Sequence, residues 1–252
     1  SSKVILSKEE NNAAAKLNLA IAFQQQGRHE MALAVLDVAQ NDFEKDVGEG
    51  AVWSDLTWRR VKTLLALDRE QAAFEALKKA TNSPETATPE LHNLLGLLEL
   101  KKGNSQAAEQ HFRKAIEYSP EMIAACVNLS HALKSLQKYD DALSTLNRCS
   151  DMSGNEINML YNLGILYLDG KFSRIKGVQQ YERAKSYFEE FVSKSSDDSY
   201  KKLAAKYLGE SVRKIKKEKK KAELKAKLEK MRRAKEAADA ANGDNGDGGD
   251  GG

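Results

Sequence analysis

Proline, cysteine and aromatic residues are scarce in this sequence. Its 252 residues include three prolines and two cysteines, and aromatic side chains make up 7% of it. There is no run of about 18 apolar residues, so the pattern predicts no transmembrane helix, and no signal peptide is visible. Glycine-rich phosphate loops, GxSxG turns and HExxH pairs are also missing. The sequence therefore predicts no transmembrane span and carries no motif of a common class of enzyme.

Histidine and aspartate form no recognisable metal or catalytic pattern. The histidines lie on different predicted helices and lack the spacing of paired ligands. They are His29, His92, His111 and His131. Asp244, Asp247 and Asp250 have the wrong spacing for a calcium loop and lack its closing glutamate. We therefore expect no catalytic residue, no metal, no cofactor and no small-molecule substrate.

The most regular stretch of the chain runs from Pro89 to Pro120. Its apolar residues recur at helical spacing in two groups, one on each side of Gly103. Glycine suits a turn at that point, and Pro120 suits the end of a second helix. Small residues at Gly96 and Ala108 would let the two helices approach closely. The stretch therefore predicts two amphipathic helices packed against each other.

These landmarks fall at the fixed places of a 34-residue unit, and the stretch resembles the tetratricopeptide repeat. Similar units are expected at 13–46, 55–88 and 123–156, and from 157 onward. A single helix pair cannot bury its own apolar face, so the units must stack. The resemblance implies an all-α fold: a right-handed superhelical solenoid of about five helix-turn-helix repeats with a C-terminal capping helix.

Three stretches depart from the regular repeat. In the second unit the turn at Asp68 is one residue short, and Lys62 stands where a small residue is usual. Residues 41–51 predict a lengthened helix end and a loop. Residues 169–180 predict an insertion at the turn of the fifth unit, which would project from one edge where partners often bind.

The chain is expected to have four parts. A flexible lead-in at 1–12 precedes the solenoid at 13–198. A capping helix over 199–241 extends into a basic charged helix, and a disordered Gly/Asp tail follows at 242–252. Cys126 and Cys149 fall at core-facing places of the fourth unit, which favours two buried thiols. A disulfide is the alternative and would imply an oxidising compartment.

The resemblance also implies a groove lined by the first helix of each repeat. Aliphatic side chains share this row with asparagines, whose amides can pair with a peptide backbone. The expected ligand is a protein or peptide. A clamp for chaperone tails is disfavoured because asparagines replace the basic residues it needs. The candidate groove residues are Asn18, Arg59, Arg60, Asn93, Leu97, Asn128, His131, Asn158, Tyr161 and Asn162.

Charge is unevenly distributed, although the whole chain carries only +3. Residues 201–236 hold sixteen Lys/Arg and five Glu, a net charge of +11. No aromatic residue is interleaved for base stacking beyond Ile215, which favours a solvated helix or one strand of a coiled-coil contact. Nucleic acid or an anionic surface is the alternative ligand. The candidate contact residues of this basic helix are Lys217, Lys220, Lys221, Arg232 and Arg233.

The sequence thus predicts a non-enzymatic scaffold that binds a partner peptide or subunit in the groove. Its extended fifth repeat and its Lys/Arg-rich helix also look similar to tetratricopeptide proteins of bacterial gliding-motility and pilus-assembly machinery. That similarity would place the scaffold in a motility or envelope assembly. Both the bacterial cytoplasm and the periplasm fit this interpretation.

Overall fold

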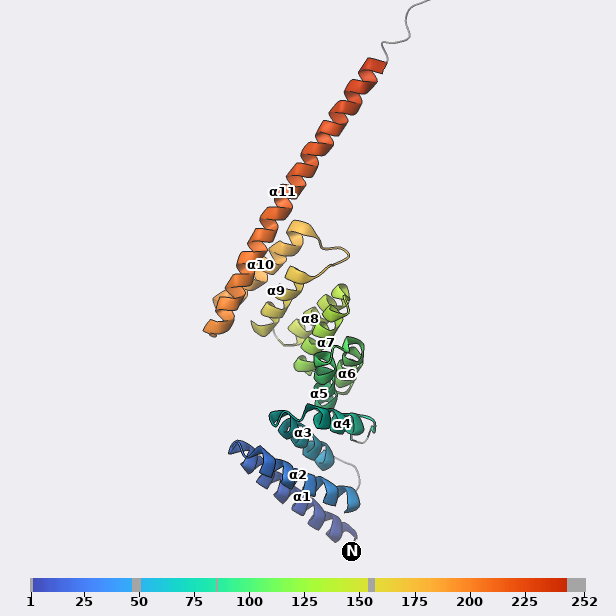
Figure 1. Ribbon diagram of the computed structural model, residues 1–252, viewed down its shortest axis with the longest axis vertical. Helices are drawn as coiled ribbons and strands as arrows, with labels where there is room; N and C mark the ends of the chain where they lie inside the picture. Colours follow the sequence, from blue (N-terminus) through green and yellow to red (C-terminus); the bar gives the residue numbers. More distant parts are fainter. Residues whose placement is uncertain (1, 47–50, 85, 154–156, 244–252) are drawn as a thin grey trace, which may run out of the picture. The chain divides into compact units, whose positions relative to one another are not determined.

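The structure, a computed structural model, describes residues 2–46, 51–84, 86–153 and 157–243. Every regular element within these ranges is an α-helix, in agreement with the predicted fold class. Figure 1 shows the helices coloured along the chain. The chain divides into two compact units, Ser1–Gly154 (unit 1) and Asn155–Gly252 (unit 2). The helices are α1 (Ser2–Gln25), α2 (His29–Asp46), α3 (Ala51–Ala66), α4 (Glu70–Thr81), α5 (Pro89–Lys101), α6 (Ser105–Tyr118), α7 (Ile123–Ser135), α8 (Tyr139–Met152), α9 (Ile157–Asp169), α10 (Gly177–Lys194) and α11 (Asp198–Gly243).

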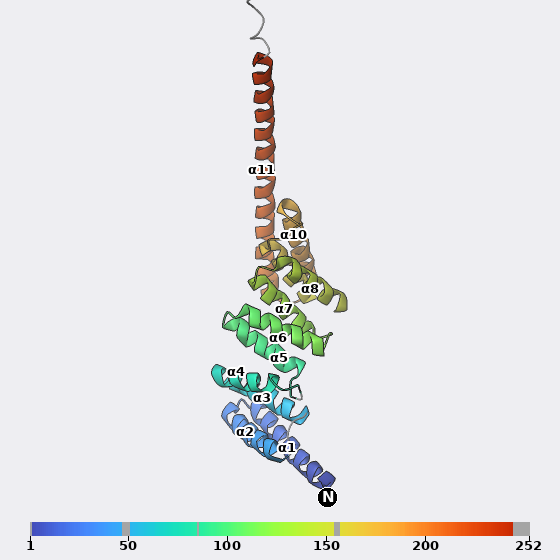
Figure 2. The ribbon, with the colours of Figure 1, turned by 90° about the vertical axis from the view of Figure 1, so that its right-hand side faces the viewer.

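Unit 1 is built from successive helix pairs. α1 packs on α2, α3 on α4, α5 on α6 and α7 on α8, and each pair also contacts the next (Figures 1 and 2). The first helices contact one another in the order α1, α3, α5, α7, so they form one layer, which we call the first-helix layer. Fully buried leucines such as Leu36, Leu56 and Leu95 fill the core between the helices. Each pair thus buries its apolar face against its neighbours, as a stacked repeat requires.

The turns inside these pairs use the left-handed backbone conformation. Gly27 and Gly103 have φ angles of +71° and +83°, which glycine adopts at little cost. Asp68 and Gln137 stand at the corresponding turns of the second and fourth pairs, with φ angles of +56° and +61°. Asp68 therefore occupies the place of the turn glycine, and the second repeat starts one residue earlier than expected.

This register decides which side chains of α3 face inwards. Val61 holds the place that Gly96 holds in α5, and it is fully buried. Lys62, which was expected at this helix–helix contact, is exposed, and its ammonium lies 4.6 Å from the centre of the Trp58 ring. The expected assignment of repeat two was wrong by one residue, because aspartate in place of glycine concealed the turn.

The small residues of the repeat allow close approach of the paired helices. A Cβ on Gly96 would lie 2.6 Å from Cε1 of Phe112 in α6. In unit 2, a Cβ on Gly164 would lie 2.7 Å from Cε1 of Phe188 in α10. Atoms cannot come this close, so a glycine at this place lets the phenylalanine ring lie directly against the backbone of the first helix.

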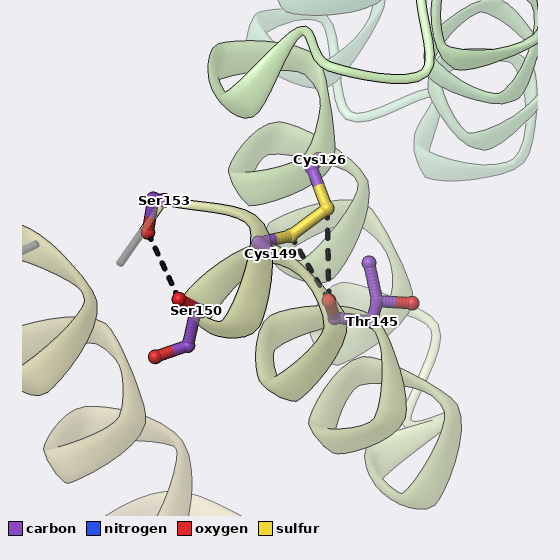
Figure 3. The surroundings of a disulfide bond; sticks show 5 residues. All are labelled: Cys126, Thr145, Cys149, Ser150 and Ser153. Carbon is purple, nitrogen blue, oxygen red and sulfur yellow. Dashed lines mark hydrogen bonds between the residues drawn. A yellow bond between two sulfur atoms is a disulfide. The ribbon is translucent and has the colours of Figure 1, made fainter. Parts of the chain in front are cut away.

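A disulfide joins α7 to α8 (Figure 3). The Cα atoms of Cys126 and Cys149 are 6.1 Å apart, and both residues are buried, as their core-facing places predicted. The favoured interpretation of two free thiols was wrong. Spacing along the chain places the two residues on facing helices, but it does not specify whether their sulfur atoms are bonded.

Unit 2 packs α9, α10 and α11 on one another. The expected insertion lies between α9 and α10, but its centre does not project as a free loop. Phe172 is buried, with its ring centre 5.3 Å from that of Tyr167. The buried Gln180 donates its side-chain amide to the carbonyls of Tyr167 and Gly170 at 2.7 and 2.8 Å. These contacts hold the insertion against the two helices that it joins.

α11 covers the residues expected as a cap and as a basic extension. Its first part packs on α10 and α9, with Ala204 and Ser211 fully buried, and Lys214 Nζ donates to the carbonyl of Leu168 at 3.1 Å. From residue 219 to residue 239 every side chain is exposed. Across the described residues, no helix combines the length and the apolar character that a membrane span needs.

Both ends of the chain were expected to lack regular structure, and the structure describes a helix at one end and only part of the other. α1 begins at Ser2, so the residues expected as a flexible lead-in are helical and run directly into the first repeat. The residues of the expected Gly/Asp tail lie outside the described part of the chain from residue 244 onward.

Candidate functional site

Trp58 on α3 stands between two cavities of unit 1. It is half-buried, so its indole ring is held in place and still reachable. One cavity, of about 360 Å³, adjoins the start of α5 and is lined by Ser54, Asp55, Trp58, Thr88 and Glu90. The other, of about 270 Å³, adjoins the end of α1 and the start of α2, and we call it the Trp58 pocket. It is lined by Gln24, His29, Trp58, Arg59, Lys62, Thr63 and Ala66.

Hydrogen bonds between elements fix the walls of both cavities. Gln24 Nε2 donates to Thr63 Oγ1 at 2.6 Å and so ties α1 to α3. On the other side, Ser54 Oγ donates to the carbonyl of Thr86 at 2.9 Å, and the Thr86 hydroxyl donates to the carbonyl of Ala80 at 2.7 Å. Thr86 is buried, so these bonds order the junction that precedes α5.

The Trp58 pocket is cationic. The Arg59 guanidinium lies 5.6 Å and the Lys62 ammonium 4.6 Å from the centre of the indole ring, within the range of cation–π attraction. Arg59 is also paired with Asp55 at 3.4 Å, but Asp55 belongs to the other cavity, and the residues that line the Trp58 pocket include no carboxylate. A ligand that offers an apolar group next to an acidic one would therefore complement this pocket.

Arg59 and Arg60, both expected in the groove, point to different parts of unit 1. Arg60 Nε is 2.5 Å from Asp37 Oδ1 of α2. It also lines a separate cavity of about 350 Å³ with Trp53, Ala76 and Lys79 among others. The structure therefore places Arg59 at the candidate site and Arg60 away from it, because consecutive helical residues face different directions.

Asn93 and Asn128 are bonded to each other. Asn128 Nδ2 donates to Asn93 Oδ1 at 2.9 Å, and Asn93 is 8% exposed. This amide pair links α5 to α7 and uses one donor of Asn128 and one acceptor position of Asn93. A contact of either asparagine with a peptide backbone stays a prediction. Of the other candidates in unit 1, Asn18, Leu97 and His131 are exposed on the first helices.

Tyr161 lies in an aromatic cluster of unit 2. Burial, and next the nearby Tyr207 and Tyr200 phenols, raise the pKa of Tyr161. Asn162 Nδ2 donates to the carbonyl of Asn158, which is exposed, at 3.0 Å. α11 thus covers part of the row that was expected to line the groove on α9. The rings within 5.3–6.3 Å of Tyr161 are Phe188, Phe191, Tyr200 and Tyr207.

His92 and His111 meet between α5 and α6, although the sequence showed no pairing. Their Nδ1 atoms are 3.2 Å apart, and His92 stacks on His111 and on Tyr118. His92 is 1% exposed. Burial, with smaller contributions from His111 and Lys114, lowers the pKa of His92 to about 4. In the described part of the chain no third metal-binding side chain joins them, so we interpret the pair as part of the packing of repeat three.

The basic residues expected as a second contact are all exposed on α11. Arg233 pairs with Glu229 at 2.6 Å and Arg232 with Glu236 at 3.4 Å, one helical turn apart in each case. Such exposed pairs support the helix only slightly. The exposed set includes Lys217, Lys220, Lys221, Arg232 and Arg233.

Trp58 was not singled out from the sequence as a pocket wall. The signal that could have identified it is the turn. If Asp68 is set at the glycine place of the 34-residue unit, Trp58 moves to the fifth place, one of those expected to line the groove.

The fold and the site define a class: stacked helix pairs that offer a grooved binding surface. A family model described as the tetratricopeptide repeat matches residues 99–161. The solved structure of YrrB, described as a TPR protein with an unusual peptide-binding site, aligns with a TM-score of 0.58 and 17% identity, over 82% of this chain and 100% of that one. At this identity the likeness shows the fold. Residues 99–161 thus match the tetratricopeptide repeat, and the helix pairs have the fold of an α-helical solenoid.

Two curated relatives share the repeats over a limited length. The anaphase-promoting complex subunit cut9 of Schizosaccharomyces pombe is 31% identical over 90 residues, which are 33% of this chain and 13% of that protein. The UDP-N-acetylglucosamine–peptide N-acetylglucosaminyltransferase of Giardia intestinalis is 32% identical over 104 residues, 38% of this chain and 7% of that protein. This chain thus spans a small part of each relative.

Proposed function

We propose that this chain is a non-enzymatic scaffold that binds a partner peptide or subunit on the first-helix layer of unit 1, with the Trp58 pocket as the anchor. The observation that carries this proposal is the position of Trp58. One half-buried indole separates two cavities that extend from the end of α1 to the start of α5. A rigid aromatic side chain next to a cavity is the usual centre of a protein contact.

The charges around Trp58 suggest the chemistry of the partner. An apolar side chain could lie against the indole ring, while an adjacent carboxylate could pair with Lys62 and Arg59. The exposed Asn18, Leu97 and His131 lie on neighbouring first helices and could extend the contact. We therefore expect an acidic segment with one apolar anchor residue.

Tetratricopeptide repeats generally act in protein–protein interactions, and the likeness to a structure with a peptide-binding site supports the same role for this chain. The activities of the two longer curated relatives belong to those whole proteins. A role in a bacterial motility or envelope assembly stays a prediction from the sequence resemblance.

A peptide selection tests the proposal. A random peptide library is displayed on phage and selected on the immobilised full chain, and the dissociation constants of enriched peptides are measured by fluorescence anisotropy. We expect acidic peptides with an apolar residue, bound at least tenfold more weakly by Lys62→Glu and by Trp58→Ala. Lys78→Glu and Val38→Ala, at exposed positions on α4 and α2, serve as matched controls and should bind normally.

Lys62 is exposed, so its reversal should leave the helical circular dichroism signal unchanged, which separates lost binding from lost folding. Peptides that bind all four variants equally well would overturn the proposal. Failure to select any peptide with a dissociation constant below about 100 µM would overturn it as well.

A further inference from the structure

Three large apolar side chains lie on the exposed half of α11. Leu224 and Leu228 are each 58% exposed and Met231 is 60% exposed. They are four and three residues apart, so they fall on one side of the helix at the a and d spacing of a coiled coil. We call these three residues the α11 stripe. No described residue of unit 2 buries them, since every side chain from residue 219 to residue 239 is exposed.

The residues next to the stripe are basic. With Leu224 and Met231 at d positions and Leu228 at a, the e and g positions from residue 220 to residue 232 hold Lys220, Lys225, Lys227 and Arg232. The glutamates of this segment lie further round the helix, where Glu229 pairs with Arg233 at 2.6 Å. Of the four edge residues, Arg232 pairs with Glu236 at 3.4 Å. The face of α11 that carries the apolar residues is therefore the face with basic side chains along its edges.

This charge pattern favours one kind of binding partner for the stripe over the others. A second copy of α11 would bring lysine and arginine against lysine and arginine in either helix direction, and like charges at e and g oppose pairing. An anionic polymer would neutralise the charge but would leave the stripe uncovered. A membrane surface needs a broader apolar face than three side chains provide. An acidic amphipathic helix would cover the stripe with its apolar side chains and pair with the basic edges through its carboxylates.

We propose that the exposed half of α11 pairs with an acidic amphipathic helix of another protein, in a short coiled coil centred on Leu228. The apolar residues of the partner pack on the stripe, and its glutamates or aspartates at e and g face the four basic residues. This contact does not depend on the Trp58 pocket. The apolar seam spans few turns, so we expect micromolar affinity that falls as salt rises.

The test uses two synthetic peptides of about three heptads that have isoleucine and leucine at a and d. One has glutamate at e and g, and the other has lysine. Binding to the full chain is measured by fluorescence anisotropy, and helix gain on mixing by circular dichroism. We expect the acidic peptide to bind at least tenfold more tightly than the basic one and to gain helix when it binds.

Matched variants separate the stripe from general charge attraction. Leu224→Gln with Leu228→Gln replaces the stripe, whereas Ala222→Gln with Ala226→Gln places the same side chains away from it. Glutamine is a good helix former, and all four positions are exposed, so both double variants should keep α11 helical. We expect the first double variant to weaken binding of the acidic peptide at least tenfold and the second to leave it within twofold.

Two results would overturn the proposal. Equal affinity of both double variants for the acidic peptide would show that charge alone attracts it. Tighter binding of a single-stranded oligonucleotide or of phosphatidylserine vesicles, unaffected by the stripe variant, would assign the basic surface to phosphates instead.

Discussion

Protonation of the buried imidazole ring of His92 opposes folding. Burial is the main cause that lowers the pKa of His92 from 6.5 to about 4, so the folded chain keeps this ring neutral at pH 5. The unfolded chain binds the proton near pH 6.5. The stabilising effect of the neutral ring is therefore fully present above about pH 7 and is lost as the pH falls from 6.5 towards 4.

We predict that a change from pH 7.5 to pH 5 lowers the free energy of unfolding of the wild type by about 2 kcal/mol more than that of His92→Phe. Phenylalanine can stack on His111 and Tyr118 but does not titrate. The measurement is urea unfolding of each protein at both pH values, followed by tryptophan fluorescence. The other titratable groups are common to both proteins, so equal pH dependence would show that His92 is not the cause.

At the scale of a helix pair, close approach depends on glycine. A Cβ on Gly164 would meet the Phe188 ring at 2.7 Å, whereas a Cβ on Gly209, within α11, would have nothing within 4 Å. We predict that Gly164→Ala lowers the free energy of unfolding by about 1–3 kcal/mol through overpacking. Gly209→Ala should raise it by up to about 1 kcal/mol through helix propensity.

Both glycine variants are compared with wild type by urea unfolding, read by circular dichroism. They make the same chemical change in helices of the same unit, so the sign of the effect depends on the surroundings of each glycine. A stabilising Gly164→Ala would contradict the close packing of α9 on α10.

Helices were more predictable than the contacts between them. The 34-residue period placed the helix pairs, the small residue at Gly96 and the turn at Gly103, because each is a local requirement of a repeat. The register of α3 was wrong, because Asp68 adopts a conformation that glycine usually marks, and Trp58 was missed with it. The His92–His111 contact and the Cys126–Cys149 bond join facing helices, so they depend on side-chain placement that spacing alone does not specify.

At the scale of the whole molecule, tryptophan fluorescence and circular dichroism report on different parts of the chain. Both tryptophans, Trp53 and Trp58, and both cysteines lie in unit 1, so tryptophan fluorescence reports on the unit that holds the disulfide. Circular dichroism reports on the helices of both units. The effect of the Cys126–Cys149 bond can therefore be assigned to one unit without cutting the chain.

We predict that loss of this bond lowers the free energy of unfolding of unit 1 by about 3 kcal/mol, because the bond closes a loop with a sequence separation of 23 and restricts the unfolded chain. Urea unfolding of wild type and of Cys126→Ala with Cys149→Ala, read by fluorescence, should show a lower midpoint for the double variant. The part of the circular dichroism transition that arises from α9, α10 and α11 should not move.

A thiol titration of the denatured wild type, prepared without reductant, shows whether the wild type in this unfolding comparison contains the disulfide. No reactive thiol is expected, and two reactive thiols would contradict the bond. Disulfides persist in oxidising compartments and are rare in a reducing cytosol. A bonded pair in protein trapped with a thiol-blocking reagent at the moment of cell lysis would therefore favour the periplasm over the cytoplasm, and a free pair would favour the reverse.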